Sequence, residues 1–244
     1  MLNIVIPMAG RGSRFAQAGY VNPKPLIDVH GHPMIEWVVE NVRPACEHRF
    51  VFICQREHLE RFALADTLKA IAPGCGIICI DHVTEGAACT VLLAEAEIGG
   101  PDPMMIANSD QFVDAPVDDY LAAMGDGDGL IMTMPSTDPN CSYVRTDETG
   151  RVTMVREKEV ISPEATVGIY NFRHGADFVA AAREMIRKNI RTNGEFYVAP
   201  VYNEMITDRK RIVTHNVGPR VYSLGTPADL NDFLTREVSR RALG

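Results

Sequence analysis

The sequence predicts an α/β fold in which helices cover both faces of a central, mostly parallel sheet. Short apolar runs alternate with amphipathic stretches through residues 1–135, as expected for repeated strand–helix–strand units. The apolar runs do not alternate with polar residues, so both faces of each strand should be buried. A hydrophobic fraction of 46% with only 7% aromatic residues also favours an α/β fold over an all-β fold.

The strand and helix predictions for the first half follow from hydrophobic periodicity. Residues Ile35, Val38, Val39 and Val42 recur at helical spacing, which makes Met34–Val42 a clear helix. The predicted strands are Leu2–Ile6, Phe50–Cys54, Gly76–Ile80, Pro103–Ala107 and Leu130–Met134. The other predicted helices are Glu57–Ile71, Gly86–Ile98 and Val117–Met124.

The second half is less regular. The turn at residues 147–150 predicts a hairpin between Ser142–Thr146 and Arg151–Val155. The remaining predicted elements are strands Thr166–Phe172 and Arg220–Leu224 and helices Ala176–Lys188 and Ala228–Arg240. Because no flexible linker interrupts the chain, we expect residues 1–244 to form a single domain. Its parts would be residues 1–135 and a smaller lobe at residues 136–244.

Charge and composition exclude several classes of protein. A formal net charge of −8 argues against non-specific nucleic-acid binding, which depends on basic patches, but allows a local pocket for a small anion. The apolar run at Leu2–Met8 meets Pro7 and is too short for a signal peptide, and no run is long enough to span a membrane. The six cysteines lack zinc-ligand spacing, so we expect small buried thiols and a reducing, cytoplasmic location.

A glycine-containing loop follows the first predicted strand directly, at residues 7–15. Gly10 and Gly12 allow backbone N–H groups to approach phosphates at the carboxyl end of a strand, where ligands bind in open α/β sheets. The loop has neither the Gly-Lys-Ser/Thr of a P-loop nor the third glycine of a dinucleotide fingerprint. Its glycines alone are equally consistent with a simple turn.

A lysine close to this loop adds chemistry to the binding prediction. Lys24 follows Arg14 by ten positions and lies between Pro23 and Pro25, which should stiffen the backbone and exclude a helix. A fixed lysine beside an arginine-bearing loop suits charge stabilisation in phosphoryl chemistry.

An aspartate at the end of another predicted strand offers a metal ligand. Asp110 follows Asn108 and Ser109 after Pro103–Ala107, and a carboxylate there can hold a hard cation beside phosphates. The alternative is an Asx turn or helix cap. We interpret Asp114 as a cap for the following helix.

The segments Met8–Phe15 and Pro23–Ile27 together resemble the signature of the sugar-phosphate nucleotidyltransferases, and the resemblance continues almost to the C-terminus. It implies a Rossmann-like nucleotidyltransferase fold with a smaller acceptor-binding lobe. By resemblance, Arg14 clamps the triphosphate, Lys24 stabilises charge at the α-phosphate, and Asp110 binds Mg²⁺. The implied nucleotide contacts are Met8, Ala9, Gly10, Arg11, Gly12, Ser13, Glu85, Gly86 and Ala88. For the last three, a plain helix N-terminus is the alternative reading.

The same resemblance implies an acceptor site. In it, Lys158 meets the acceptor phosphate, Gly168 lies under the acceptor, and Glu157 and Glu195 accept hydrogen bonds from hydroxyl groups. Asn108 completes this set of acceptor contacts.

The chain departs from the family pattern at Ser223, where many members have a second metal-binding aspartate. Three accounts are open: Asp110, the triphosphate and water hold the metal; another carboxylate substitutes; or catalysis is impaired. We favour the first, because Mg²⁺ commonly binds through one or two carboxylates plus phosphates.

The resemblance therefore implies a metal-dependent transfer of NMP from an NTP to a phosphorylated small molecule. The expected acceptor is a sugar 1-phosphate, in nucleotide-sugar or polysaccharide biosynthesis. A cytidylyltransferase for phosphocholine is the first alternative, because choline binding needs aromatic faces. Four aromatic residues keep it open: Phe172, Phe196, Tyr197 and Tyr202. The other alternative is a non-catalytic nucleotide-binding regulator. The sequence leaves the base, the acceptor and the oligomeric state open, a homo-oligomer included.

Overall fold

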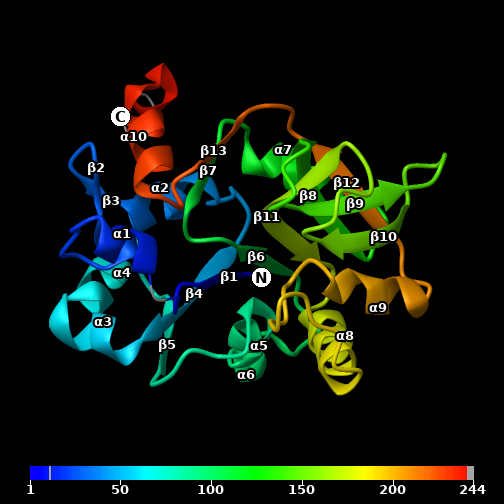
Figure 1. The fold of residues 1–244 in the computed structure, drawn as a ribbon. Helices are drawn as coiled ribbons and strands as arrows, with labels where there is room; N and C mark the ends of the chain where they lie inside the picture. The colour runs from blue at the N-terminus through cyan, green and yellow to red at the C-terminus, as the bar shows by residue number, and fades with distance from the viewer. Residues whose placement is uncertain (11, 241–244) are drawn as a thin grey trace.

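The computed structural model describes residues 1–10 and 12–240, and within this part nine strands form one twisted sheet (Figure 1). Seven of them lie in the order β10-β9-β11-β6-β1-β4-β5, and β8 pairs with both β11 and β12. The strands are β1 (Leu2–Pro7), β4 (His48–Gln55), β5 (Gly76–Ile80), β6 (Met104–Ala107), β8 (Gly129–Pro135), β9 (Ser142–Thr146), β10 (Val152–Glu157), β11 (Glu164–Phe172) and β12 (Ile212–Asn216).

The sheet is parallel in its first half and mixed in its second. β1 lies between β4 and β6 and runs parallel to both, with Val5 opposite Val51 on one side and Ile106 on the other. β11 is antiparallel to β6, β8 and β9, whereas β12 is parallel to β8. The predicted α/β class with a largely parallel central sheet is confirmed.

Helices cover both faces of this sheet (Figure 1). On one face, Ile4 and Ile6 of β1 pack in a core with α2 (Met34–Asn41), α4 (Leu64–Ile71) and α7 (Val117–Ala122). On the other, Val5 belongs to a core that includes residues of α5 (Ala87–Leu92), α8 (Gly175–Arg187) and α9 (Val201–Thr207). Because consecutive strand residues point to opposite faces, burial on both sides explains why the strands are apolar without alternation.

A third apolar cluster joins residues near the N-terminus to residues near the C-terminus of the chain. It packs Phe15 of α1 (Ser13–Gln17) and Trp37 of α2 near Phe233 of α10 (Pro227–Thr235). Trp37 and Phe233 meet edge to face with ring centroids 5.6 Å apart. β7 (Gln111–Val113) and β13 (Val221–Ser223) form a separate antiparallel pair that brings the C-terminal segment to the end of β6.

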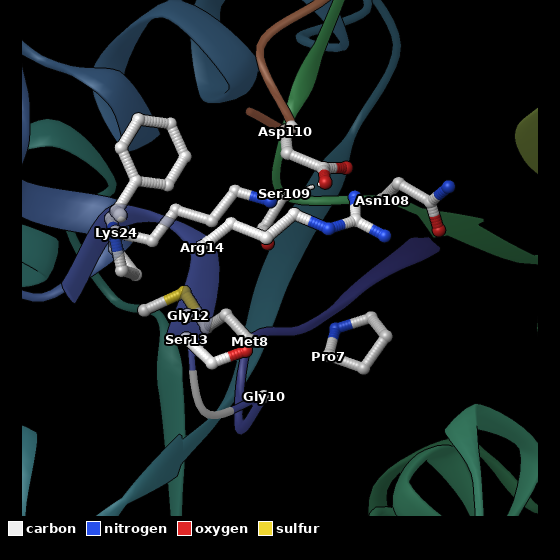
Figure 2. A pocket seen from close by; sticks show the side chains of 13 residues that line it. Pro7, Met8, Gly10, Gly12, Ser13, Arg14, Lys24, Asn108, Ser109 and Asp110 are labelled. Carbon is white, nitrogen blue, oxygen red and sulfur yellow. Dashed lines mark hydrogen bonds and ion pairs between the residues drawn. The ribbon is translucent and has the colours of Figure 1, made fainter. Parts of the chain in front are cut away.

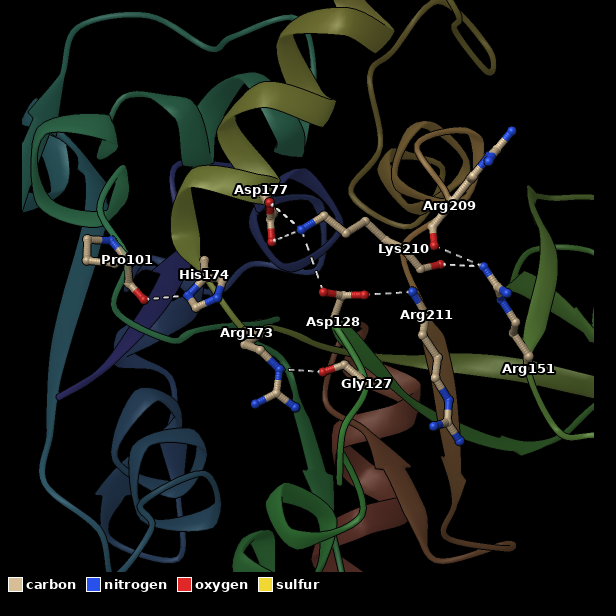
Figure 3. Close-up of polar contacts among 10 residues, drawn as sticks. All are labelled: Pro101, Gly127, Asp128, Arg151, Arg173, His174, Asp177, Arg209, Lys210 and Arg211. Carbon is tan, nitrogen blue, oxygen red and sulfur yellow. Dashed lines mark hydrogen bonds and ion pairs between the residues drawn. The ribbon is translucent and has the colours of Figure 1, made fainter.

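A polar network holds β12 against the start of β8 (Figure 3). The Lys210 ammonium lies 3.1 Å from a carboxylate oxygen of Asp177 and 3.6 Å from one of Asp128. The hydrogen bond that Lys210 donates to Asp177 is the main cause of a raised pKa at Lys210. The Arg211 N–H donates to Asp128, and the Arg151 guanidinium donates to two backbone carbonyls nearby. This network joins the segment before β12 to Asp128, to Asp177 and to Arg151.

Two predicted helices are each divided in two. Residues 57–71 form α3 (Arg56–Arg61) and α4, because Ala63 between them adopts a left-handed backbone with φ 50°. Residues 86–98 form α5 and α6 (Glu95–Ile98). The hydrophobic pattern continues across both breaks, so periodicity could not reveal them.

Other local predictions were wrong: the absence of any helical turn at Lys24, the helix cap at Asp114 and the single helix over residues 228–240. Lys24 begins a single 3₁₀ turn, η1 (Lys24–Leu26), because Pro23 caps the turn and Pro25 occupies a first-turn position whose N–H is not needed. Asp114 caps no helix, since Pro116 occupies the N-cap position of α7. The predicted helix at 228–240 ends at Thr235 and is followed by a 3₁₀ turn, η2 (Glu237–Arg240).

Several short elements escaped prediction altogether: α1, α9, β7, β12, and the small pair β2 (Asp28–Val29) and β3 (His32–Pro33). The cysteine prediction holds only in part. All six thiols are free, but Cys54 alone is buried and Cys46 is exposed. Burial raises the pKa of the Cys54 thiol to about 12. No helix in the described ranges has the length and apolar character needed to cross a membrane.

Candidate functional site

The loop after β1 and the turn after β6 meet at the carboxyl ends of the parallel strands. They enclose a cavity of about 420 Å³, here named the loop cavity (Figure 2). Its wall comes from the glycine loop, η1, the Asn108–Asp110 turn and Gly225. β1 and β6 are neighbours in the sheet, which is why residues about 100 positions apart line one space.

Backbone hydrogen bonds fix the glycine loop over the sheet. The Met8 N–H donates to the Ile53 carbonyl at 2.9 Å, and the Gln55 side-chain amide donates to the Ala9 carbonyl at 2.7 Å. Gly12 has φ 57° and precedes α1, and a Cβ atom there would lie 3.5 Å from the Lys24 Cβ. The loop therefore packs directly on the lysine.

Most of the predicted loop residues line this cavity, whereas Ala9 lines a different cavity beside α5. Met8, Gly10, Gly12, Ser13 and Arg14 line the loop cavity. Arg11 lies outside the described residues.

Two basic side chains cross the loop cavity toward the turn after β6 (Figure 2). The Lys24 ammonium donates a hydrogen bond to Oδ2 of Asp110, and both side chains are partly buried. Arg14 is exposed in the first turn of α1, and within the described part its guanidinium has no hydrogen-bond or ion-pair partner. The cavity thus combines one paired cation with one that is available to an anionic ligand.

A second cavity, of about 500 Å³, opens on the other side of the same turn and is here named the sheet cavity. It shares Asn108 and Asp110 with the loop cavity. Gly168 of β11 has φ 94°, and a Cβ atom there would lie 2.1 Å from Nδ2 of Asn108. The Asn108 N–H also donates to the Gly168 carbonyl at 3.0 Å. Glycine is needed at 168 so that the Asn108 amide can lie against β11.

Polar side chains line the far end of the sheet cavity. The Ser142 hydroxyl donates to the Glu157 carboxylate, and burial raises the pKa of Glu157 above its ordinary range. Tyr197 also lines this cavity, whereas the predicted acceptor contact Lys158 does not. The Lys158 ammonium donates to the Tyr197 hydroxyl at 2.6 Å and lies 4.7 Å from the centre of that ring. The hydrogen bond to Tyr197 raises the pKa of Lys158, and the charges of Glu157 and Glu195 add to the effect.

A third cavity, of about 250 Å³, lies beside the N-terminus of α5 and is here named the helix cavity. Ala9, Gly10, Thr84, Gly86 and Glu195 contribute to its wall, and Asn108 joins it to the other two cavities.

Gly86 has a steric reason to be glycine. Its φ is 140°, and a Cβ atom there would lie 2.4 Å from the Phe196 carbonyl oxygen. The backbone of Phe196 bonds on both sides of it, to the Glu85 carbonyl at 2.9 Å and the Ala88 N–H at 3.0 Å. The absence of a side chain at Gly86 therefore allows the start of α5 to pack against the segment before α9.

Two of the predicted base contacts do not reach the helix cavity. Ala88 is fully buried in the core, and the Glu85 side chain points to Arg191, whose guanidinium lies 2.5 Å from its carboxylate. Instead, Thr84 and Ala87 line the cavity beside Gly86. The Thr84 hydroxyl donates a hydrogen bond to the Gly86 carbonyl at 2.9 Å.

The side chains around Asp110 offer oxygen ligands, which are the hard donors that Mg²⁺ prefers. Gly225 brings the chain close to Asp110, since a Cβ atom at 225 would lie 3.1 Å from Oδ2 of Asp110 and 3.3 Å from Oγ of Ser223. The Ser223 hydroxyl in turn donates to Asp229 at 3.0 Å. No group of three or more histidine, cysteine or acidic side chains converges among the described residues. The donor set fits Mg²⁺ if phosphate oxygens complete the shell.

Sequence reasoning missed Asp229, because an acidic residue in the first turn of a helix is common and nothing in the sequence relates it to Ser223. It also missed Gln111, a short-strand residue on the wall of the sheet cavity. The alternation of β7 could have flagged Gln111 only if that strand had been predicted.

Comparison with known proteins adds to this geometry. A family model described as a MobA-like NTP transferase domain matches residues 4–157. A nucleoside-diphosphate-sugar pyrophosphorylase from Vibrio cholerae RC9 is 27% identical with a TM-score of 0.81, and the match covers 96% of this chain and 100% of that one. No curated protein matches the chain.

Two more distant structures share the fold. A UDP-glucose pyrophosphorylase complexed with UDP-glucose is 18% identical with a TM-score of 0.80, covering 99% of this chain and 100% of that one. An inositol-1-phosphate CTP transferase from T. maritima is 13% identical with a TM-score of 0.74, covering 98% and 94%. At these identities the likeness concerns the fold alone.

Proposed function

Because the chain belongs to the family of MobA-like NTP transferase domains, we propose that this nucleotidyltransferase uses a sugar 1-phosphate as its acceptor and requires Mg²⁺. It would transfer NMP from an NTP to the acceptor and release pyrophosphate. One observation carries the proposal: Asn108 lines all three cavities, and Asp110 lines two of them. A base in the helix cavity, phosphates in the loop cavity and an acceptor in the sheet cavity would therefore meet at one turn.

The reaction is a single displacement at the α-phosphorus. An oxygen of the acceptor phosphate forms a bond to the α-phosphorus while the bond from that phosphorus to the bridging oxygen of the β-phosphate breaks. The bonding electrons leave with pyrophosphate. The reaction requires no protein nucleophile, so the chain contributes position and charge.

Lys24 and Arg14 supply the positive charge that the described residues place in the loop cavity. Arg14 projects from the first turn of α1 into the loop cavity without a partner among the described residues, which suits it to the leaving pyrophosphate. The Lys24 ammonium sits on a flexible stem, so it can exchange Asp110 for an oxygen of the α-phosphate in the same cavity. This positive charge is needed most in the transition state, when negative charge is spread over the equatorial oxygens of the α-phosphate.

We propose that Asp110 binds Mg²⁺ directly and that Asp229 supports it through Ser223. Bound Mg²⁺ would neutralise phosphate charge. Ser223 left three accounts of the metal site open. This proposal takes the first, in which Asp110, the triphosphate and water hold the metal, and adds Asp229, which accepts a hydrogen bond from Ser223. A hydrogen-bonded carboxylate of this kind orients the groups that contact a metal.

The acceptor cavity favours a sugar phosphate over phosphocholine. Three of the four aromatic residues that could have faced a choline group, Phe172, Phe196 and Tyr202, are buried in the core. The face of the fourth, Tyr197, already carries the Lys158 ammonium. A second cation there would be repelled, whereas Glu157, Ser142 and Thr166 offer partners for hydroxyl groups.

The substrate assignment is tested by measuring pyrophosphate release for ATP, CTP, GTP, UTP and dTTP, each with a panel of sugar 1-phosphates and with phosphocholine. We expect turnover with at least one sugar 1-phosphate and none with phosphocholine, and loss of turnover when EDTA removes Mg²⁺. Turnover with phosphocholine alone would identify the cytidylyltransferase alternative. Nucleotide binding without turnover for any acceptor would indicate a regulator.

Replacing Lys24 with alanine should lower kcat by about 100-fold or more, because it removes charge stabilisation from the transition state. Circular dichroism and the thermal unfolding midpoint should stay close to wild type, since the Lys24 side chain lines the loop cavity and belongs to none of the apolar cores. Lys69→Ala, at an exposed position of α4, is the matched control and should keep full activity. A folded Lys24→Ala enzyme with near-normal kcat would rule out this role.

The metal assignment predicts unequal effects for two aspartates. Asp110→Asn should nearly abolish turnover at any Mg²⁺ concentration. Asp229→Asn should raise the Mg²⁺ concentration for half-maximal rate by about 10-fold, as expected for a group behind the ligand. Asp66→Asn, on the exposed side of α4, controls for loss of a negative charge. Unchanged Mg²⁺-dependent turnover in Asp110→Asn would contradict the assignment.

A further inference from the structure

The segment that joins α8 to α9 contains a tight hairpin beside the start of α5 (Figure 1). Thr192 and Glu195 exchange two backbone hydrogen bonds, of 3.1 and 3.0 Å. Asn193 and Gly194 between them have φ 50° and 84°, and positive φ at both central residues is characteristic of a type I′ turn. The turn thus fixes the backbone of Glu195, which lines the helix cavity.

The hairpin needs further contacts to keep its place, because an isolated hairpin is only marginally stable in water. Its last three residues, 193–195, are exposed. Phe196, directly after it, is buried, and its backbone bonds to Glu85 and Ala88 at the start of α5. This anchors one end of the hairpin, and the residue before Thr192 has to anchor the other.

Arg191 supplies the second anchor through all three of its side-chain nitrogens. Nε donates to the Asn189 side-chain oxygen at 2.6 Å, and one terminal nitrogen donates to the Gly194 carbonyl at 3.0 Å. The other terminal nitrogen donates to the Glu85 carboxylate at 2.5 Å. The guanidinium also lies 3.9 Å from the centre of the Phe196 ring. A planar guanidinium can make these contacts together, whereas a lysine ammonium cannot.

The residue held in this way lies between two cavities. The Glu195 carboxylate lines the helix cavity and forms no hydrogen bond or ion pair with the described residues. Its charge adds to the raised pKa of Glu157, which burial causes in the first place, and to that of Lys158, which the hydrogen bond to Tyr197 causes. A free carboxylate here can accept a hydrogen bond from a hydroxyl group of a bound substrate.

We propose that Arg191 is a positioning residue for the transfer reaction: it fixes the hairpin at residues 192–195 on α5 and thereby directs the Glu195 carboxylate at a substrate hydroxyl group. The inference rests on the proposed function, because it places the nucleoside in the helix cavity and the acceptor in the sheet cavity. Arg191 acts without touching substrate, since its nitrogens already have partners within the protein.

Arg191→Ala separates this role from a purely structural one. Glu85 is 67% exposed, and ion pairs at such positions contribute little to the free energy of unfolding. The thermal midpoint should therefore fall by no more than about 4 °C. In contrast, kcat/KM should fall by about 10- to 100-fold, because a contact group is displaced. Arg191→Lys keeps the charge but not the planar group, and we expect most of the same loss.

A cycle with Glu195→Gln tests whether Arg191 acts through Glu195. In the Glu195→Gln background, Arg191→Ala should lower kcat/KM by less than about threefold. Arg183→Ala is the matched control, because Arg183 of α8 pairs with Glu95 of α6 at 2.6 Å and lines none of the three cavities. It should keep kcat/KM within about twofold of its parent in both backgrounds.

Deoxy analogues of the two substrates distinguish the source of the hydroxyl group. One arm uses NTPs without the 2′- or the 3′-hydroxyl of the ribose, and the other uses monodeoxy analogues of the acceptor. In the wild type, the analogue that lacks the contacted hydroxyl should react with a lower kcat/KM than its parent compound. In Arg191→Ala, these two should react almost equally, while the ratios for the other analogues stay as in the wild type.

The inference is overturned by independent, multiplying losses in the cycle, by a near-normal kcat/KM in Arg191→Ala, or by full activity of Arg191→Lys, which would leave charge as the cause. A wild-type enzyme that turns over only another kind of acceptor would overturn the proposed substrate alone, since the cycle is then measured with that acceptor. A wild type with no turnover on any acceptor would overturn the proposed function and the inference with it, before any variant is made.

Discussion

The ion pair between Lys24 and Asp110 is the contact on which the candidate site depends. It joins the segment after the glycine loop to the turn after β6, two parts of the chain that the sheet brings together through the neighbouring strands β1 and β6. The partners are partly buried, so the pair holds a cation and a carboxylate where phosphates would bind. Removing either charge would leave the other partly buried without its partner.

Glycine residues supply the second constraint, because the site needs close approach between backbones. Gly86 allows α5 to lie against the backbone at Phe196, Gly168 admits the amides of Asn108 and Gln111, and Gly225 lies against Asp110. The three cavities thus converge on the Asn108–Asp110 turn. That convergence explains how one short turn can serve a nucleotide, a metal ion and an acceptor in the proposed reaction.

The sequence predicted the parts of this arrangement that depend on local pattern. Burial on both faces made the strands β1, β4 and β6 predictable from the sequence, and the loop residues that line the cavity followed from their place after β1. The breaks at Ala63 and near Ala94 were invisible, because the apolar spacing continues across them. Ala88 was misassigned because a buried helix residue and a ligand contact look alike in a small-residue motif. Gln111 and Asp229 depend on the β7–β13 pairing, which only tertiary structure shows.

The central claim is that the acceptor phosphate attacks the α-phosphorus directly, with no covalent nucleotidyl-enzyme. The most direct test is the stereochemical course with an NTP that carries a single sulfur of defined configuration on the α-phosphate. One in-line displacement inverts the configuration at that phosphorus, and inversion is the predicted result. Retention would require two displacements through a nucleotide bound covalently to the protein, and would contradict the account.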